Sequence, residues 1–459
     1  MKRRQFLYAG ALTGLSFVTL KITGCKSGTE KAIVSETAPT GFQLEEITIS
    51  ELQQKLSSGD FTSSSLTQIY LDEINRIDKN GPALNSIIEI NPDALAIAGQ
   101  MDEERKNNKV RGPLHGIPVL IKDNIDTADN MQTTAGALAL SGNKAKSDAF
   151  VVKKLREAGA VILGKTNLSE WANFRSTRSS SGWSSRGGQT KNPYLLDRSP
   201  CGSSSGSAVA VAANLCVVAV GTETDGSIAC PASINGIVGI KPTVGLVSRT
   251  GIIPISHTQD TAGPFGRTVS DAAILLGAMT GIDPADKVTE ESQGKSHSDY
   301  TRFLQADGLK GKKIGIEKSL LKVHEGVDAL LASALEHMKT AGATIIEVEF
   351  MKKNREIGDA EFEMMLFEFK AGVNNYLANA NAQVKSLDDV IRFNKENEAK
   401  AMPYFKQELL EQAVAKGGLD SKEYKDALKT LFTGRKFLDD LIAKNQLDAL
   451  CAPATGTSW

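Results

Sequence analysis

The sequence lacks several features by which classes of protein are recognised. Its 459 residues carry a formal net charge of -1, so no basic surface for nucleic acid is expected. None of its five cysteines lies in a CxxC pair, the usual spacing of zinc sites and redox pairs. An apolar stretch at residues 8–20 is too short to span a membrane as a helix. What remains is an ordinary globular composition, 41% hydrophobic and 23% charged, which permits a sizeable core.

The cysteines beyond the N-terminus are expected to be small buried side chains. They are scattered along the chain, at Cys201, Cys216, Cys230 and Cys451. The spacing does not decide whether any two of them form a disulfide. No metal site is predicted.

The first 25 residues have the composition of an export signal. A basic start, MKRR, precedes the apolar stretch, and its paired arginines before FL resemble a twin-arginine signal. The letters ITGC then resemble a bacterial lipobox, in which Cys25 would be lipidated. In the alternative, favoured by Lys21, the signal is simply cleaved and Cys25 has no role. We therefore predict an exported bacterial protein, periplasmic or anchored to the membrane only through a lipid, with residues 26–45 as a linker.

Hydrophobic periodicity beyond the linker predicts an α/β fold. Apolar residues from Ile49 to Ile77 recur at three- and four-residue spacing, as in two amphipathic helices. Short apolar runs at residues 118–121, 160–163 and 215–220 alternate with helix-like segments and read as buried strands. The pattern predicts a large, mixed, mostly parallel twisted sheet with helices on both faces, in a single domain over residues 46–459.

A serine-rich stretch, SPCGSSSGS at residues 199–207, precedes a helix of small residues. Its centre fits the G-x-S-x-G elbow of α/β-hydrolases, with Ser204 as nucleophile. That elbow requires a strand that leads into the turn, whereas residues 197–200 read as a loop. It also requires a later histidine, and the histidines of this chain lie mostly in polar, helix-like or loop surroundings. They are His115, His257, His297, His324 and His337. Both requirements therefore disfavour the elbow interpretation.

A second run of small residues, GTETDGSI at 221–228, follows the third predicted strand. Its backbone amides can converge on one point, an arrangement that stabilises an oxyanion. Ser227 at the end of this run is a candidate nucleophile, but a serine hydroxyl needs a base. Lys122, at the end of another strand, is available, because burial lowers the pKa of a lysine and lets its neutral amine accept a proton.

Several blocks of the sequence together resemble the amidase signature family, and within it the bacterial peptide-amidase branch. The family blocks are GIPVLIKDN (116–124), GSSSGS (202–207), GSI (226–228) and GIKPT (239–243). The blocks that resemble the branch are KTNLSEW (165–171), TETDGS (222–227) and GIIPI (251–255). Each block alone is weak, but their joint occurrence is specific.

The resemblance implies a site and a reaction. Ser227 matches the acylated nucleophile, Ser203 the bridging serine after a cis peptide bond, and Lys122 the base. The backbone N–H groups of the loop that ends at the nucleophile would receive the oxyanion; they belong to Thr224, Asp225, Gly226 and Ser227. The implied reaction hydrolyses a carboxamide to an acid and ammonia through an acyl-serine, without a metal or an organic cofactor.

The resemblance also suggests a substrate. The loop at residues 179–185 resembles the border of the family's acyl pocket, so Ser179 and Trp183 are candidate substrate contacts. The expected substrate is the C-terminal amide of a peptide, or another small or fatty amide, and the expected state is a monomer. The alternatives are an amidotransferase subunit that acts on aminoacyl-tRNA, a fatty-acid amide hydrolase and a catalytically silent lipoprotein that binds amides.

The C-terminus differs from the family pattern. The chain ends in LDALCAPATGTSW at residues 447–459, where the family normally continues into further sheet and helix. We therefore expect the domain of residues 46–459 to be truncated at its C-terminus.

Overall fold

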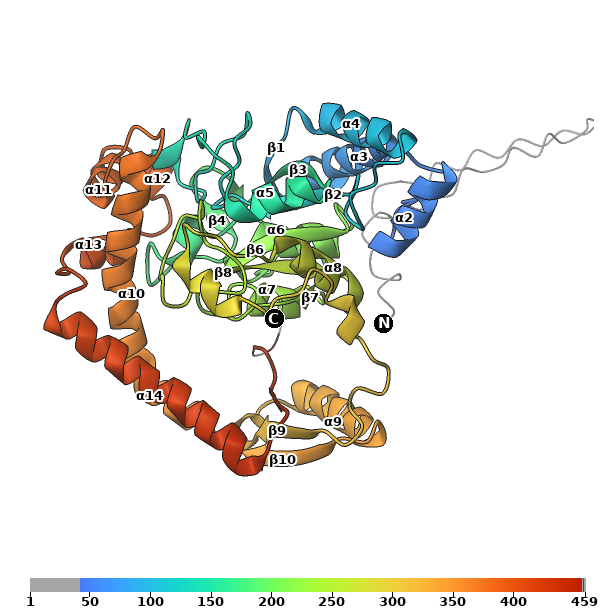
Figure 1. Ribbon diagram of the computed structural model, residues 1–459. Helices are drawn as coiled ribbons and strands as arrows, with labels where there is room; N and C mark the ends of the chain where they lie inside the picture. Colours follow the sequence, from blue (N-terminus) through green and yellow to red (C-terminus); the bar gives the residue numbers. More distant parts are fainter. Residues whose placement is uncertain (1–41, 456, 458–459) are drawn as a thin grey trace, which may run out of the picture. The chain divides into compact units, whose positions relative to one another are not determined.

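The three buried apolar runs of the sequence become neighbouring strands of one sheet in the computed structural model, which describes residues 42–455 and 457 (Figure 1). They are β2 (Pro118–Lys122), β3 (Val161–Thr166) and β6 (Val218–Glu223). β2 pairs in parallel with both others, and every residue of the three strands is buried. Parallel strands that are covered on both faces are expected to read as continuous apolar runs, as these do.

Antiparallel strands complete this six-stranded sheet, whose order is β1-β3-β2-β6-β8-β7. β1 pairs with β3 at one edge, and β8 pairs with both β6 and β7 at the other. The added strands are β1 (Ile87–Ile90), β7 (Val238–Gly239) and β8 (Thr261–Gly266). The predicted mixed α/β sheet with a parallel centre is confirmed.

Helices flank the sheet, and α6, built of small buried residues, contacts strands β1, β2, β3, β6 and β8. The residues from Thr48 onward form one unit. The helices are α2 (Ile49–Ser58), α3 (Ser63–Glu73), α4 (Ala94–Lys106), α5 (Phe150–Glu157), α6 (Ser205–Ala212), α7 (Ala229–Ile234), α8 (Val269–Met279), α9 (Glu325–Thr340), α10 (Met351–Asn379), α11 (Leu387–Glu396), α12 (Glu398–Ala401), α13 (Glu408–Val414) and α14 (Lys422–Asn445).

The two predicted N-terminal helices are α2 and α3. Thr48 and Thr62 cap them, each accepting the backbone N–H three residues later. Gly59 separates them with a φ of 84°, a left-handed conformation that glycine adopts at no steric cost. Local capping chemistry therefore fixes this part of the fold.

Two small sheets lie outside the six-stranded one. β9 (Lys313–Glu317) pairs in parallel with β10 (Thr344–Val348) and β11 (Ala449–Cys451). β4 (Trp183–Ser184) and β5 (Gly188–Gln189) form a short antiparallel hairpin. The long helix α10 supplies apolar side chains to a core cluster that also includes Trp171 and Phe174.

The third central strand begins later than the apolar run predicts. The run starts at Leu215, whereas β6 begins at Val218 and extends through Thr222 to Glu223. A run of consecutive apolar residues carries no period that marks where a strand starts. Thr222 and Glu223 therefore belong to the strand, and only the residues from Thr224 form the loop.

The segments that carry the predicted export signal, Cys25 and most of the linker lie outside the described residues. Among the helices that the structure describes, none is long and apolar enough to cross a membrane.

Candidate active site

Lys122 is the last residue of β2, and its side chain is fully buried. Its Nζ donates to Ser203 Oγ at 2.8 Å and to Thr222 Oγ1 at 2.8 Å. Thr222, on the neighbouring strand β6, also accepts from Asn124 Nδ2 at 3.0 Å. Thr222 therefore holds the lysine amine against the serine.

Burial changes the protonation of this lysine. Withdrawal from water lowers the pKa of Lys122 to about 7, although the negative charges of Asp260 and Glu223 act in the opposite direction. A substantial fraction of the amine is then neutral near neutral pH. Lys122 can therefore accept a proton, which an ordinary surface lysine cannot do at that pH.

Ser203 follows a cis peptide bond from Gly202 and is fully buried at the start of the segment that leads into α6. Its carbonyl oxygen accepts the N–H of Ser169 at 3.1 Å. A Cβ on Gly202 would lie 2.4 Å from Ser169 Oγ and 2.8 Å from Ser205 Oγ, so no larger residue fits there. The packing explains why a glycine precedes Ser203.

Ser227 ends the loop that joins β6 to α7. The backbone N–H groups of this loop donate no hydrogen bond to any part of the chain that the structure describes; they belong to Thr224, Asp225, Gly226 and Ser227. Glu223 closes the loop, because its carboxylate accepts the N–H groups of Ile228 at 2.6 Å and Ala229 at 2.9 Å. The ends of the loop are therefore fixed, while its four backbone N–H groups have no hydrogen-bond acceptor among the described residues.

The structure brings Lys122 and Ser203 into direct contact, and it places Ser227 against the neighbouring backbone. The N–H of Ser204 donates to the carbonyl oxygen of Ser227 at 3.3 Å. Among the described residues, no hydrogen bond joins the Oγ atoms of Ser203 and Ser227. Catalytic hydrogen bonds are often longer without substrate and shorten when it binds.

Ser204, the nucleophile of the elbow alternative, has another role. Its Oγ donates to the carbonyl oxygen of Thr222 at 3.0 Å and accepts the N–H of the same residue at 3.2 Å. The hydroxyl is fully buried and ties this segment to β6.

The two candidate substrate contacts lie on the loop of residues 179–185. This loop passes close to Gly202, the residue before Ser203, because a Cβ on Gly202 would contact Ser181 of the loop. Ser179 is half-buried, and its backbone N–H donates to Ser176. Trp183 is 6% exposed and packs edge-on against Tyr404 and Phe405. The indole is thus largely enclosed by its own neighbours.

A disulfide joins the two segments that carry the candidate serines. It links Cys201, two residues before Ser203, to Cys230 on α7, three residues after Ser227, with their Cα atoms 6.0 Å apart. The scattered spacing of the cysteines did not predict this pair. Cys216 is the small buried residue that was expected.

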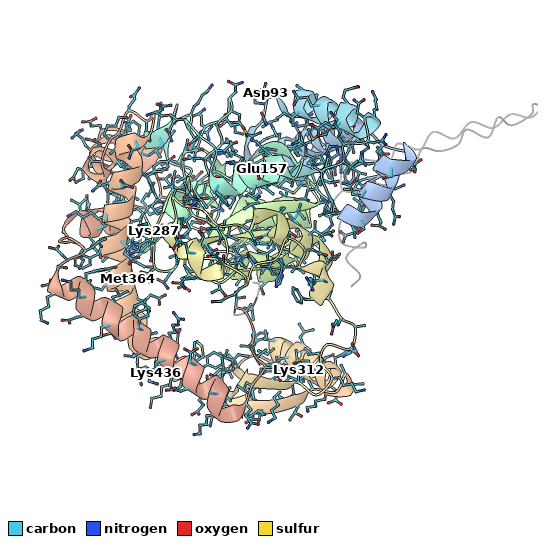
Figure 2. The ribbon with its side chains drawn as sticks, viewed as in Figure 1. Asp93, Glu157, Lys287, Lys312, Met364 and Lys436 are labelled. Carbon is cyan, nitrogen blue, oxygen red and sulfur yellow. A yellow bond between two sulfur atoms is a disulfide. The ribbon has the colours of Figure 1, made fainter. Side chains whose placement is uncertain are left out.

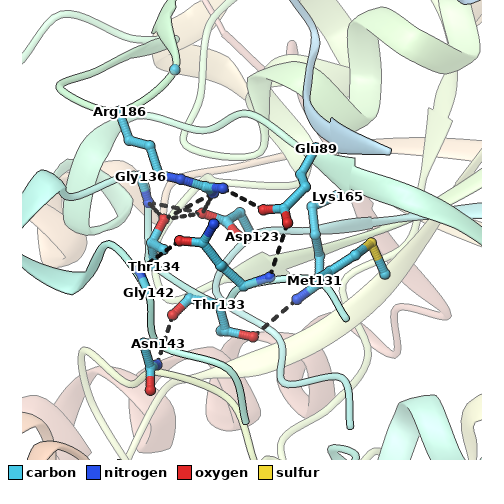
Figure 3. A network of polar contacts seen from close by, with 12 residues as sticks. Glu89, Asp123, Met131, Thr133, Thr134, Gly136, Gly142, Asn143, Lys165 and Arg186 are labelled. Carbon is cyan, nitrogen blue, oxygen red and sulfur yellow. Dashed lines mark hydrogen bonds and ion pairs between the residues drawn. The ribbon is translucent and has the colours of Figure 1, made fainter. Parts of the chain in front are cut away.

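A second buried lysine lies in a polar network on the neighbouring strand (Figure 3). Lys165 on β3 donates to the carbonyl oxygen of Ile125 at 2.6 Å and to Thr133 Oγ1 at 3.0 Å. The register pairs Lys165 with Ile121 and not with Lys122, so the two lysines point to opposite faces of the sheet. Lys165 therefore takes no direct part in the site.

Two of the histidines make contacts away from the lysine and the serines. His115 is buried, and its Nε2 lies 3.0 Å from the carbonyl oxygen of Met101. His257 is exposed and lies beside Glu368. Within the described ranges, no group of three or more His, Cys, Asp or Glu residues is arranged to hold a metal ion.

The contacts of Thr222 and Glu223 and the position of Asp260 were not predicted from the sequence. Thr222 and Glu223 stand inside the quoted run GTETDGSI, so their position was visible although their contacts were not. Asp260 lies 36 residues from its partner Thr224, and only the fold brings them together.

Solved structures of amidases have the same fold. The chain is 50% identical to the native peptide amidase from Stenotrophomonas maltophilia, with a TM-score of 0.86, over 90% of this chain and 84% of that one. A peptide amidase in complex with the competitive inhibitor chymostatin is also 50% identical, with a TM-score of 0.86, over 89% of this chain and 84% of that one. At this level of similarity the fold and the family are shared.

Curated relatives correct the predicted localisation. A probable amidase of Arabidopsis thaliana is 44% identical over 423 residues, which cover 89% of this chain and 80% of the relative. Putative amidases of Schizosaccharomyces pombe and Arthroderma benhamiae are 42% and 44% identical, and the chain spans 63% and 55% of their lengths. These relatives are eukaryotic, so the prediction of an exported bacterial lipoprotein is wrong. It rested on a basic start and a short apolar stretch, and short motifs also arise by chance.

The match to a family model extends over most of the sequence. The model described as Amidase matches residues 66–459, which include Lys122, Ser203 and Ser227. Together with the shared fold and with relatives above 40% identity, this match is decisive. The chain belongs to the amidase family.

Proposed function

We propose that this amidase hydrolyses the C-terminal carboxamide of peptides to an acid and ammonia through an acyl-enzyme at Ser227. The observation that carries the proposal is the buried hydrogen bond of 2.8 Å between Lys122 Nζ and Ser203 Oγ. The loop of residues 224–227 adds four backbone N–H groups that have no acceptor among the described residues. A base, a relay and an oxyanion site are the parts that serine-based acyl transfer requires.

Acylation begins with two proton transfers. Neutral Lys122 takes the proton of Ser203, and Ser203 takes that of Ser227 while Ser227 Oγ attacks the amide carbon. The carbonyl oxygen becomes an oxyanion and receives hydrogen bonds from the loop of residues 224–227. As the oxyanion collapses, the C–N bond breaks and the leaving nitrogen takes a proton returned through Ser203, which releases ammonia.

Deacylation repeats these steps with water. Water gives a proton to the same relay and attacks the ester carbon, and the bond to Ser227 Oγ then breaks. The acid leaves, and Ser227 regains its proton. These steps need neither a metal nor an organic cofactor.

The peptide part of the proposal rests on the similar peptide amidase and on the loop of residues 179–185. Ser179 and Trp183 are proposed to border the acyl pocket. The buried indole of Trp183 packs against the exposed ring of Tyr404 and is proposed to hold that ring at the edge of the pocket. An exposed aromatic ring can pack on a peptide side chain.

A panel of amides tests the substrate. We expect a purified soluble form to release ammonia from a blocked dipeptide amide with a higher kcat/KM than from a long-chain fatty amide or from glutamine. No internal peptide bond should be cleaved, which mass spectrometry checks. Preference for the fatty amide or for glutamine would replace the proposed substrate class. Absence of ammonia from every amide, with the protein folded, would favour the silent binder.

The pKa of Lys122 predicts the pH dependence of the reaction. The base must be neutral, and its pKa is lowered to about 7, so kcat/KM should fall as the pH drops through about 7. Well below that pH the fall should approach about tenfold per unit, because one proton blocks the base. The measurement is kcat/KM from about pH 5 to about pH 9, with circular dichroism to verify folding. A flat profile across that range would exclude Lys122 as the titrating base.

A further inference from the structure

Asp260 connects the loop of residues 224–227 to the rest of the molecule. Its Oδ1 accepts the hydroxyl of Thr224, the first residue of that loop. Its Oδ2 accepts the backbone N–H groups of Ile255 and Ser256, both at 2.9 Å. One carboxylate therefore joins the oxyanion loop to a second loop, residues 255–260.

The second loop is itself fixed from α10. Glu368 on this helix is 1% exposed, and its carboxylate accepts the hydroxyls of Ser256 and Thr258 and, at 3.0 Å, the N–H of Thr258. Met364, labelled in Figure 2 on the same helix, lies with its sulfur 3.6 Å from Ser256 Oγ. A continuous series of hydrogen bonds thus runs from α10 through Ser256 and Asp260 to Thr224.

We propose that Asp260 is a positioning residue of the amidase: it fixes the oxyanion loop through Thr224 and sets the charge felt by the lysine base. The inference rests on the proposed amide hydrolysis and adds to it a residue that touches neither the substrate nor the reacting atoms. Such a residue acts through the orientation of donors that must already point at the oxyanion before it forms.

The charge of Asp260 bears on Lys122 as well. The carboxylates that raise the pKa of Lys122 against its burial are Asp260 and Glu223. Burial raises the pKa of Asp260 itself to about 6, while the hydrogen bonds that its carboxylate accepts, first of all that from Thr224, act to lower it. The charge of Arg249, which is paired with Asp286, acts in the same direction. Near neutral pH the Asp260 carboxylate is therefore mostly charged, and its loss would lower the pKa of Lys122 further.

Replacement of Asp260 by asparagine separates these effects from a loss of volume. The two N–H groups of the second loop should retain the amide oxygen, so the NH2 group faces Thr224 and can only donate to its hydroxyl. The contact with Thr224 then reverses its direction and loses the charge of the carboxylate, which weakens it. We expect kcat of Asp260→Asn to fall by about 10- to 100-fold, and the acidic limb of the pH profile to move to lower pH. A purely structural role would change stability without moving that limb.

Thr224 supplies the partner variants. Thr224→Val removes the hydroxyl and should lower kcat as Asp260→Asn does. The same hydroxyl helps to keep the pKa of Asp260 down, so the acidic limb should move in the same direction as in Asp260→Asn, but less far. Thr224→Ser keeps the hydroxyl and should lose less of the rate than Thr224→Val does. The losses of rate in the double variant Asp260→Asn with Thr224→Val should be less than additive, because both changes act on the same contact. Asp283→Asn is the matched control, since Asp283 also caps a loop but bonds to Ser248 and Ala285.

The readout is made independent of the amide substrate by a fluorophosphonate that labels the nucleophilic serine. Its second-order labelling rate is measured against pH for each variant. This rate should fall in the same variants as kcat, and its acidic limb should shift in the same direction. The inference would be overturned if folded Asp260→Asn had the parental labelling rate and the parental acidic limb of the pH profile. Losses of rate that add in the double variant would overturn it as well. If the parent is labelled but releases no ammonia from the peptide amide, the proposed substrate fails, while the labelling rates still decide the role of Asp260.

Discussion

Ser227→Ala is expected to abolish ammonia release from the blocked peptide amide while the protein stays folded. Without this oxygen no acyl-enzyme forms, and loss of a catalytic serine typically lowers kcat by about 10⁴- to 10⁶-fold. Ser227 is small, lies at the end of a loop and is 6% exposed, so its replacement by alanine leaves little void. The measurement is ammonia release over time at matched protein concentration, with covalent labelling by the fluorophosphonate in parallel.

The control is a serine on the helix that follows. Ser233→Ala changes an exposed side chain of α7, six residues beyond Ser227, and should retain the parental rate. If Ser227→Ala kept more than about a hundredth of the parental kcat, the nucleophile would have to be another residue. Ser203 or Ser204 in the preceding segment would then be tested next.

Lys122→Met removes the proposed base and should lower kcat by about 10²- to 10⁴-fold, the usual contribution of a general base. Methionine has a similar length and suits a fully buried position, so the effect is expected in the chemistry more than in the fold. The remaining activity should no longer show the acidic limb near the pKa of about 7. The measurement is kcat/KM against pH for both proteins.

Two further lysine variants separate the base from the charge. Lys122→Arg keeps a positive charge but stays protonated at every practical pH, so it should be as inactive as Lys122→Met. Lys165→Met changes the buried lysine on the opposite face of the sheet and should lower the thermal midpoint without removing the acidic limb. Full activity in Lys122→Arg would exclude proton transfer through this side chain.

The sequence predicted those parts of the site that depend on short segments. A buried apolar run that ends in a lysine predicted Lys122 at the end of a strand, and the run of small residues predicted Ser227 in the segment that follows another strand; the structure confirms both positions. The capped helices α2 and α3 were predictable for the same reason, because their signals lie within a few residues. Both conclusions needed only local patterns and the family blocks.

The parts that could not be predicted depend on residues far apart in the chain. The contact between Asp260 and Thr224 spans 36 positions, and that between Arg175 and the carbonyl oxygen of Phe405 spans 230. Neither residue type signals its partner in the sequence. The enclosure of Trp183 follows from the same long-range packing, so its exposure could not be judged beforehand.

The disulfide between Cys201 and Cys230 also constrains the unfolded chain. It closes a loop over a sequence separation of 29, and loss of chain entropy in such a loop destabilises the unfolded ensemble by about 3–4 kcal/mol in the simplest model. That loop contains Ser203 and Ser227, so thermal or chemical denaturation with the bond intact leaves the two serines on one small ring. Refolding of the oxidised chain then starts with the two halves of the site already near each other, whereas a reduced chain must find that proximity by diffusion.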